Sequence, residues 1–246
     1  MVFILLSCFV NYVTHVNYVI LHTVKLNLVM KTALVIGVGP GLGLALVRKF
    51  FAAGYKIIMV ARSMEKLKDF AATVSGSEDG IAYYQADVGD RDSIGTAINK
   101  ILHEQGVPDI IIYNVSVLRP ASPSKIDYDT FLEDFKINVG GALTTYQKVR
   151  PALQEKGEGI FIFTGGGLSL SPFHEFASLG VGKAGLRNLV ACMAQENKDS
   201  GIMVYTITIN GMIEKGTFFD PEKIAEKFYE VCENGLPECE AEFIYQ

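Results

Sequence analysis

Gly37-Val38-Gly39-Pro40-Gly41-Leu42-Gly43 is the stretch of this 246-residue sequence that decides its fold. The apolar segment Thr32–Ile36 precedes it and predicts a buried strand, and residues 42–53 predict an amphipathic helix that ends before Gly54. Glycines let the backbone approach an anion, and the free N–H groups and dipole of a helix N-terminus favour negative charge. The sequence therefore predicts a phosphate site formed by Gly37, Gly39, Gly41, Leu42 and Gly43.

Apolar strands and amphipathic helices alternate along the rest of the chain. The predicted strands are Thr32–Ile36, Lys56–Ala61, Ile81–Ala86, Asp109–Tyr113, Gly159–Thr164, Met203–Ile209 and Ala241–Tyr245. The predicted helices span about residues 42–53, 64–73, 91–105, 128–155, 175–199 and 221–233. Most strands are continuous apolar runs, as expected where helices cover both faces of a parallel sheet. We therefore predict a single α/β domain over residues 30–246, with a doubly wound, Rossmann-type parallel sheet of about seven strands in a three-layer α/β/α arrangement.

Composition narrows the classes of function. The chain is 49% hydrophobic and 20% charged, with a formal net charge of −5 and no basic run, so nucleic acid is not an expected partner. The cysteines show no ligand-like spacing with the histidines; they are Cys8, Cys192, Cys232 and Cys239. We expect reduced thiols in a cytoplasmic protein, and no metal.

The first 29 residues differ from the rest. Their only charged side chain is Lys25, and polar residues such as Asn11 and His15 interrupt the apolar ones. A signal peptide fits poorly, since a basic start and a small-residue cleavage site are missing. A membrane anchor and an extra packed element stay open as alternatives, although the polar residues make a membrane span unlikely. We expect that Met30 is the natural start and that residues 1–29 are a leader outside the fold.

The spacing Gly37-x3-Gly41-x-Gly43 fits no G-x-G-x-x-G frame and resembles the short-chain dehydrogenase/reductase family. The resemblance extends over about residues 30–246 and implies a nicotinamide cofactor. Arg62 follows the second predicted strand, where an acidic residue would accept hydrogen bonds from a ribose 2′-hydroxyl. A guanidinium suits a phosphate instead, so Arg62 favours NADP over NAD. The alternative is a surface arginine without a ligand.

Other segments that follow the predicted strands also resemble the family. By resemblance, Asp87 and Val88 lie near the adenine ring, and Asn114 begins a run that lines the adenosine. Val115 and Ser116 depart from the family's Asn-Ala-Gly run. From the residues alone, the aspartate could instead cap a turn and the asparagine could bridge two strands. After the sixth strand, resemblance suggests that Thr217 contacts the nicotinamide carboxamide.

The family's catalytic groups are an Asn, a Ser, a Tyr and a Lys. Asn138 and Lys183 lie in segments that resemble the first and the last of these, and Lys183 is also expected at the cofactor ribose. The family's serine follows the asparagine by 28 residues, and its tyrosine follows 13 later; here these positions are Gly166 and Leu179. Two of the four catalytic groups are therefore expected to be absent.

Other polar side chains could supply the proton. His174 is the best acid among them, because imidazole titrates near neutrality; Thr164, Ser169 and Ser171 lie near it in the sequence. The run Gly165–Gly167 is either an exit from the fifth strand that needs positive φ or a set of backbone N–H groups that face a substrate. Two functions follow: an atypical NADP-dependent reductase of a small carbonyl compound, or a non-catalytic NADP-binding sensor or partner subunit.

The predicted helices 128–155 and 175–199 carry apolar residues over much of their surface, including Leu186, Leu189 and Met193. Similar proteins pair these two helices across a two-fold axis. We therefore expect a homodimer or homotetramer through them. The alternative is that all these side chains pack on the sheet.

Overall fold

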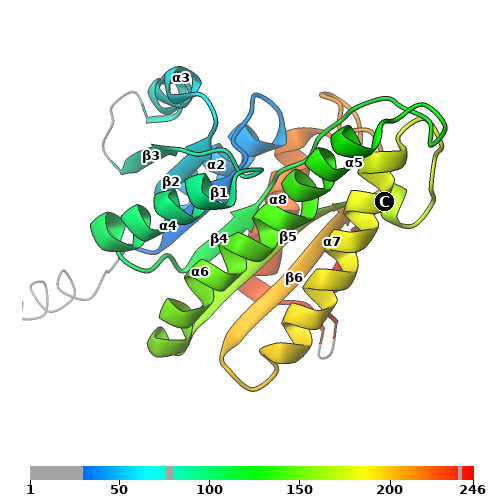
Figure 1. Cartoon of the computed structure of the whole chain (residues 1–246). Coiled ribbons are helices and arrows are strands. Elements are labelled where there is room, and N and C mark those ends of the chain that lie inside the picture. The colour runs from blue at the N-terminus through cyan, green and yellow to red at the C-terminus, as the bar shows by residue number, and fades with distance from the viewer. Residues whose placement is uncertain (1–29, 76–79, 238–239) are drawn as a thin grey trace, which may run out of the picture. The chain divides into compact units, whose positions relative to one another are not determined.

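The computed structural model describes residues 30–75, 80–237 and 240–246, so the predicted leader over residues 1–29 lies outside the described part. Residues Thr32–Gln246 form one compact unit. Its centre is a seven-stranded sheet in the order β3-β2-β1-β4-β5-β6-β7, in which every neighbouring pair is parallel (Figure 1). This confirms the predicted doubly wound sheet.

The strands are β1 (Thr32–Ile36), β2 (Lys56–Ala61), β3 (Ile81–Gln85), β4 (Ile110–Tyr113), β5 (Gly159–Gly166), β6 (Ile202–Ile209) and β7 (Glu242–Tyr245). Each lies within two residues of its predicted bounds. β1 pairs with β2 on one side and with β4 on the other, so the strand order reverses at β1. Ligands of such sheets bind in the crevice beyond the carboxyl ends of the strands at this point.

Two layers of helices cover the sheet. The helices are α2 (Leu42–Ala52), α3 (Met64–Ser75), α4 (Arg91–Gln105), α5 (Tyr128–Phe135), α6 (Gly141–Lys156), α7 (Ala177–Glu196) and α8 (Pro221–Asn234). Ala33 and Val35 of β1 pack in the layer of α2, α3 and α8, whereas Leu34 and Ile36 pack in the layer of α4, α6 and α7. Successive side chains of a strand point to opposite faces, so a strand covered on both faces must be apolar throughout.

The predicted helix over about residues 128–155 is present, but its hydrogen-bond geometry changes in the middle, which the sequence did not predict. A π-helical turn, Lys136–Gly140, separates α5 from α6. The buried Tyr113 hydroxyl donates a hydrogen bond of 2.7 Å to the Ile137 carbonyl inside this turn. The residue that bonds to the π-helical turn thus lies on β4, distant in the sequence. The periodicity of the helical segment therefore could not predict the turn. The turn places Asn138 in the interior.

Candidate active site

The glycines after β1 divide into two pairs. Gly37 has φ +90°, and a Cβ there would lie 2.8 Å from the carbonyl carbon of Asn114. A Cβ at Gly43 would lie 2.7 Å from the Gly37 oxygen. Gly39 and Gly41, by contrast, have no atom within 4 Å of an added Cβ. Packing therefore explains Gly37 and Gly43, and the other two glycines face open space that a ligand can approach.

A cavity of about 270 Å³ lies beside this turn. No side chain caps the N-terminus of α2 at Gly41, so the N–H groups of Leu42 and Gly43 have no side-chain acceptor, whereas the Leu44 N–H donates to the Gly39 carbonyl at 2.9 Å. The cavity brings together most of the predicted cofactor residues, namely Gly37, Gly39, Arg62, Asp87, Val88 and Asn114. Open glycines, free N–H groups and a nearby guanidinium fit the phosphates of a dinucleotide.

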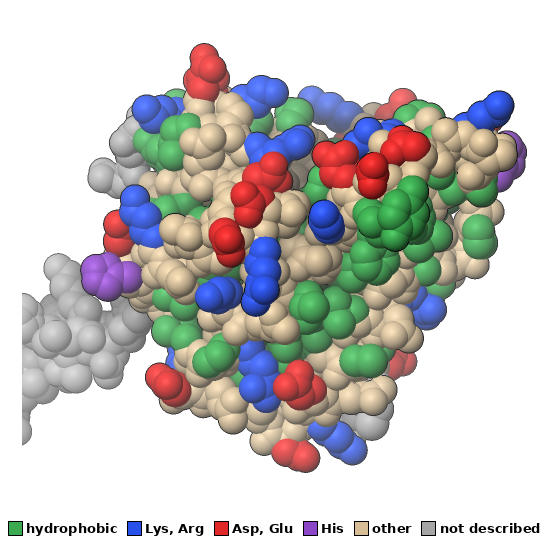
Figure 2. Space-filling model, in the orientation of Figure 1, with side chains coloured by type: hydrophobic (Ala, Val, Ile, Leu, Met, Phe, Trp, Pro, Cys, Tyr) green, Lys and Arg blue, Asp and Glu red, His purple; other side chains and the backbone are tan. Residues whose placement is uncertain are grey.

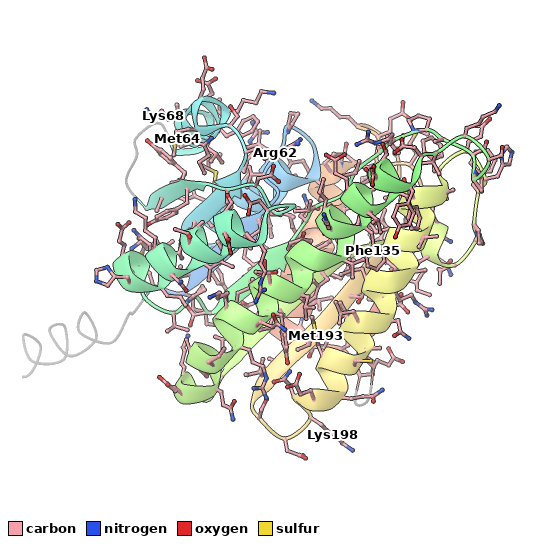
Figure 3. The ribbon with its side chains drawn as sticks, viewed as in Figure 1. Arg62, Met64, Lys68, Phe135, Met193 and Lys198 are labelled. Atoms are coloured by element: carbon pink, nitrogen blue, oxygen red, sulfur yellow. The ribbon has the colours of Figure 1, made fainter. Side chains whose placement is uncertain are left out.

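Arg62 directly follows β2 and is exposed at the cavity. The Gln85 side chain donates a hydrogen bond of 2.9 Å to the Arg62 carbonyl and so fixes the backbone there. Figure 3 shows the Arg62 side chain near the junction of β2 and α3. Within the described residues its guanidinium makes no ion pair. It is therefore free to bind a phosphate.

Two predicted adenosine contacts also have structural roles. The Asp87 carboxylate accepts a hydrogen bond of 2.9 Å from the Gly89 N–H, which closes a turn. The Asn114 amide donates to the Gly37 carbonyl at 3.2 Å and accepts from the Thr164 hydroxyl at 3.0 Å. Asn114 thus links the glycine turn to β5, as the bridging interpretation suggested. The Thr164 hydroxyl is occupied by this contact.

Lys183 lies on α7 and is only 5% exposed. Its ammonium donates hydrogen bonds to the Thr164 carbonyl at 2.7 Å and to the Val115 carbonyl at 3.2 Å. Burial lowers the pKa of the Lys183 ammonium from 10.5 to about 8, because the charged form loses hydration. The two carbonyls thus fix a cation between the ends of β4 and β5.

Asn138 is fully buried next to the same segment. Its amide oxygen accepts a hydrogen bond of 3.2 Å from the Val117 N–H, while its Nδ2 has no hydrogen-bond partner among the described residues. Gly182 makes this approach possible, since a Cβ there would lie 2.8 Å from the Asn138 Cβ. A buried amide donor without an acceptor is costly, so this orphaned N–H group needs an explanation beyond packing.

The run Gly165–Gly167 does not need positive φ, so that interpretation is wrong. Gly166 is extended, with φ −155°, and ends β5. Close neighbours explain the outer glycines: a Cβ at Gly165 would lie 2.8 Å from Thr206 Cγ2, and one at Gly167 would lie 3.0 Å from Asn210 Cα. At Gly166 the nearest atom would be Lys183 Cγ at 3.5 Å, an ordinary contact. Gly166 is thus the one glycine of this run that packing does not require.

The predicted acid lies apart from these groups. His174 is exposed in the loop before α7, and its Nδ1 lies 3.3 Å from the Ser122 hydroxyl. It makes no hydrogen bond to Lys183 or Asn138. The Ser169 hydroxyl donates to the Gly166 carbonyl at 2.8 Å. Leu179 is buried on α7, one turn before Lys183.

Thr217 lies in the short loop between β6 and α8. Its hydroxyl donates to the Glu214 carbonyl at 2.8 Å and accepts from the Phe219 N–H at 3.0 Å. Lys223 donates to the Thr217 carbonyl at 3.0 Å. Thr217 therefore organises its own loop, and its predicted contact with the carboxamide stays a prediction.

Sequence reasoning missed the groups that position Asn138 and Lys183. Tyr113 and Gly182 act through contacts with residues distant in the sequence, and two of the hydrogen-bond partners are backbone groups of Val115 and Val117. Backbone groups leave no side-chain pattern. The one available signal was Gly140-Gly141 after Asn138, because a Cβ at Gly141 would lie 2.7 Å from the Val88 oxygen.

Among residues 30–75, 80–237 and 240–246, no three His, Cys, Asp or Glu side chains are grouped as a metal site requires. Cys192 is an exposed, free thiol. No helix in this part of the chain has both the length and the apolar composition needed to cross a bilayer.

Known proteins resemble the chain in sequence and in fold. An NADPH-dependent pterin aldehyde reductase of Arabidopsis thaliana is 28% identical over 170 residues, which is 68% of this chain and 69% of the relative. A 3beta-hydroxysteroid dehydrogenase of Eggerthella lenta is 27% identical over 198 residues, or 78% and 76% of the two chains. A metagenomic short-chain oxidoreductase solved in complex with NADP has a TM-score of 0.79 at 19% identity, covering 87% of this chain and 96% of its own.

The family comparison covers most of the described unit. The sequence profile of the short chain dehydrogenases matches residues 31–220, from the start of β1 to the start of α8. The matched region includes the glycine turn, Arg62, Asn138 and Lys183. The chain therefore belongs to the short-chain dehydrogenase/reductase family.

Proposed function

We propose that the protein is an NADP-dependent oxidoreductase that reduces a small carbonyl compound at a degenerate catalytic site. The observation that carries this proposal is the Lys183 ammonium, which is buried between the Val115 and Thr164 carbonyls. Val115 also lines the cavity beside the glycine turn. Burying a cation is costly, and a ligand in the neighbouring cavity that needs a hydrogen bond from this ammonium would account for its position.

The cofactor choice rests on Arg62. Its unpaired guanidinium is placed to bind a 2′-phosphate, which favours NADP over NAD. The NADP complex of a protein with the same fold supports this assignment. Bound NADPH would supply the hydride. The open glycines Gly39 and Gly41 and the N-terminus of α2 would bind the phosphates, and Lys183 would donate a hydrogen bond to a ribose hydroxyl.

The catalytic half of the site has few polar groups. Gly166 and Leu179 provide neither a hydroxyl nor an acid where the family has its serine and tyrosine. We propose that Asn138 and Lys183 orient the ligands and that solvent water supplies the proton, with His174 as the alternative donor. General acid catalysis is typically worth about 10²–10⁴-fold, so turnover is expected to be slow.

The rim of the site favours an apolar substrate. Leu118 follows β4 and is 69% exposed, and Met212 follows β6 and is 80% exposed. Phe173, also exposed, lies between β5 and α7. The carboxyl ends of these parallel strands meet at one edge of the sheet, so the three side chains lie at the edge where substrate enters. Exposed apolar side chains at a ligand site favour a substrate with an apolar body.

We also propose association through α6 and α7. Figure 2 shows hydrophobic side chains gathered on the face that these helices share with α5, and Figure 3 places Phe135 there. Leu186 and Met193 are instead buried in the core and do not contribute to this surface. Phe135 and Leu143 are each 37% exposed, and a cavity of about 330 Å³ lies between the two helices. A second copy of the chain would cover this surface, giving a homodimer or homotetramer. A cytoplasmic location is part of the same proposal.

The test is NADPH fluorescence with the full chain, followed over time with aldehydes, ketones and enones. Enhanced fluorescence that decays with one substrate class supports the reductase. Enhancement without decay across the panel would instead support a non-catalytic NADP-binding subunit. If the fluorescence of neither NADPH nor NADH changes when the protein is added, the proposed cofactor binding is refuted.

A further inference from the structure

A buried carboxylate lies four residues before Asn138 in the sequence. Asp134, on α5, is fully buried. Its Oδ2 accepts a hydrogen bond of 2.6 Å from the Ser178 hydroxyl, and its Oδ1 lies 3.2 Å from the Arg119 guanidinium. A buried charge is costly unless it is paired and hydrogen-bonded, and here one oxygen has a hydrogen bond and the other an ion pair. The proposed function does not use this carboxylate, so its presence needs a reason of its own.

The two partners of Asp134 come from segments that are distant in the sequence. Ser178 lies in the first turn of α7, directly before Leu179. Arg119 lies in the connection between β4 and α5, two residues after Val117. The carboxylate therefore joins three segments: α5, the start of α7 and the connection that leaves β4.

The contact with Ser178 sets the register between α5 and α7, which lie side by side (Figure 1). Asn138 follows Asp134 by four residues. Gly182 likewise follows Ser178 by four, and a Cβ at Gly182 would lie 2.8 Å from the Asn138 Cβ. Residues four apart lie on one face of a helix, so the two contacts are successive points of the same interface. A slip of α7 along α5 would break both contacts and would displace Lys183, the neighbour of Gly182.

The contact with Arg119 anchors a segment that already has two partners in the site. The Val115 carbonyl accepts a hydrogen bond from Lys183, and the Val117 N–H donates one to Asn138. β4 fixes the start of this segment, and the Arg119 ion pair fixes its end. The same carboxylate thus controls the position of Lys183 through α7 and the position of its acceptor through the connection after β4.

We propose that Asp134 is a positioning residue that holds Asn138 and Lys183 in place relative to each other before a ligand binds. This inference rests on the proposed function, which gives these two residues their ligand. Groups that are fixed beforehand lower the entropic cost of binding. Asp134 acts from behind the site, through Ser178 and Arg119, and touches neither cofactor nor substrate.

Glu133 provides a matched control. It is the neighbour of Asp134 and lies 3.4 Å from the same Arg119 nitrogen, but it is exposed. Asp134→Asn removes the buried charge, and Ser178→Ala removes only the hydrogen bond to α7. Glu133→Gln removes a carboxylate from the same arginine and leaves the buried one. If Asp134→Asn does not fold, the milder Ser178→Ala decides the test.

The experiment titrates the full chain with NADPH and with adenosine 2′,5′-bisphosphate, which carries a 2′-phosphate but lacks the nicotinamide and its ribose. We expect Asp134→Asn to weaken NADPH binding about tenfold and Ser178→Ala about three- to tenfold, because Lys183 and Asn138 are no longer held in place. Binding of the bisphosphate should stay unchanged in both variants. Glu133→Gln should match the wild type with both ligands.

Amide hydrogen exchange of the unliganded proteins gives a readout that needs no cofactor. In Asp134→Asn we expect exchange to rise about tenfold over residues 114–119 and in the first turn of α7, because both segments lose an anchor. In Ser178→Ala the rise should be confined to α7. Exchange in α8, which lies in the other helix layer, should stay unchanged.

The outcomes separate this inference from the proposed function. Unchanged NADPH binding by folded Ser178→Ala and Asp134→Asn overturns the role of Asp134 alone. Equal weakening of NADPH and the bisphosphate, or exchange that rises throughout the chain, would show a contribution to stability only and would also overturn it. If the wild type binds neither NADPH nor NADH, the proposed function fails. A local rise in exchange would then still support Asp134 as the residue that fixes the two segments, and its absence would overturn that as well.

Discussion

Two glycine-rich segments leave the sheet of this protein, one after β1 and one at the end of β5, and they differ in what the glycines do. After β1, packing requires Gly37 and Gly43, and open space lies beside Gly39 and Gly41. At the end of β5, packing requires the outer glycines, whereas a Cβ at Gly166 would make only an ordinary contact with the Lys183 stem, at 3.5 Å. The first segment leaves open space that a ligand can approach, whereas at the second we propose that a catalytic group is absent. Glycine alone does not distinguish the two cases; its neighbours do.

The largest effect is expected for Gly37→Ala. Its φ of +90° strains an alanine, and the added Cβ would overlap Asn114. Gly54→Ala is the matched control, because Gly54 has φ +87° but no atom within 4 Å of its Cβ position. Strain alone should cost Gly54→Ala about 1 kcal/mol of unfolding free energy, and strain plus overlap should cost Gly37→Ala about 3 kcal/mol or more. Chemical denaturation measures both; equal losses would show that the turn after β1 is not close-packed.

The second prediction concerns the two catalytic groups whose absence we propose, at Gly166 in β5 and at Leu179 in α7. The double variant Gly166→Ser with Leu179→Tyr should raise reduction of a ketone by about 100-fold, since it restores a hydroxyl and an acid beside Lys183. The control is the double variant Gly165→Ser with Leu179→Tyr. It should unfold at a lower temperature than the Gly166→Ser double variant, because Thr206 blocks the Cβ added at position 165. No gain by the Gly166 variant, if it is folded and binds NADPH, would mean that the site departs from the family elsewhere as well.

The contrast between the two segments also explains what the sequence could predict. The strand Thr32–Ile36, the turn after it and the start of α2 follow from local patterns, and the structure has them where expected. The π-turn around Asn138 depends on Tyr113, and the position of Lys183 depends on two backbone carbonyls. Such contacts join residues that are distant in the chain, so no local pattern records them.

The glycine run of β5 shows the same limit. A glycine triplet is expected to need positive φ, but here the reason for Gly165 and Gly167 is contact with Thr206 and Asn210 of the neighbouring chain segment. That contact exists only after β5 and β6 have paired. Family resemblance did identify Gly166 and Lys183 as positions of interest, yet only the structure shows that a Cβ at Gly166 would not clash and that Lys183 has fixed partners.

The third prediction concerns the cofactor side. Arg62→Asp should weaken NADPH binding about 10- to 100-fold and improve NADH binding, because a carboxylate repels a 2′-phosphate and accepts hydrogen bonds from ribose hydroxyls. Arg91→Asp, at an exposed arginine outside the cavity, should leave both affinities unchanged. The measurement is a fluorescence titration with each cofactor. If both variants lost NADPH affinity equally, the effect of Arg62→Asp would come from the change in net charge and not from a contact with the 2′-phosphate.

The fourth prediction uses the pKa of Lys183, which burial lowers to about 8. A neutral amine is a weaker partner for a ribose hydroxyl, so NADPH affinity should fall severalfold as pH rises through about 8. Stability should change in the opposite direction: between about pH 8 and 10.5 the unfolded chain binds more protons than the folded one, so the wild type gains unfolding free energy with pH. Lys183→Met should show neither trend. Parallel titrations of the two proteins in binding and in thermal unfolding isolate the contribution of this one group.

The smallest effect is expected for His174→Ala. The imidazole is exposed, contacts Ser122 and packs against Phe173 with ring centroids 5.2 Å apart. It makes no hydrogen bond to Lys183 or Asn138. If water is the proton source, kcat of the variant should fall no more than about threefold. His103→Ala, at an exposed histidine of α4, is the matched control and should give the same small change. A loss of about 100-fold confined to His174→Ala, with disappearance of a near-neutral pKa from the rate profile, would identify His174 as the acid. The proton donor would then come from the loop before α7, and His174 would take the place of the family's tyrosine.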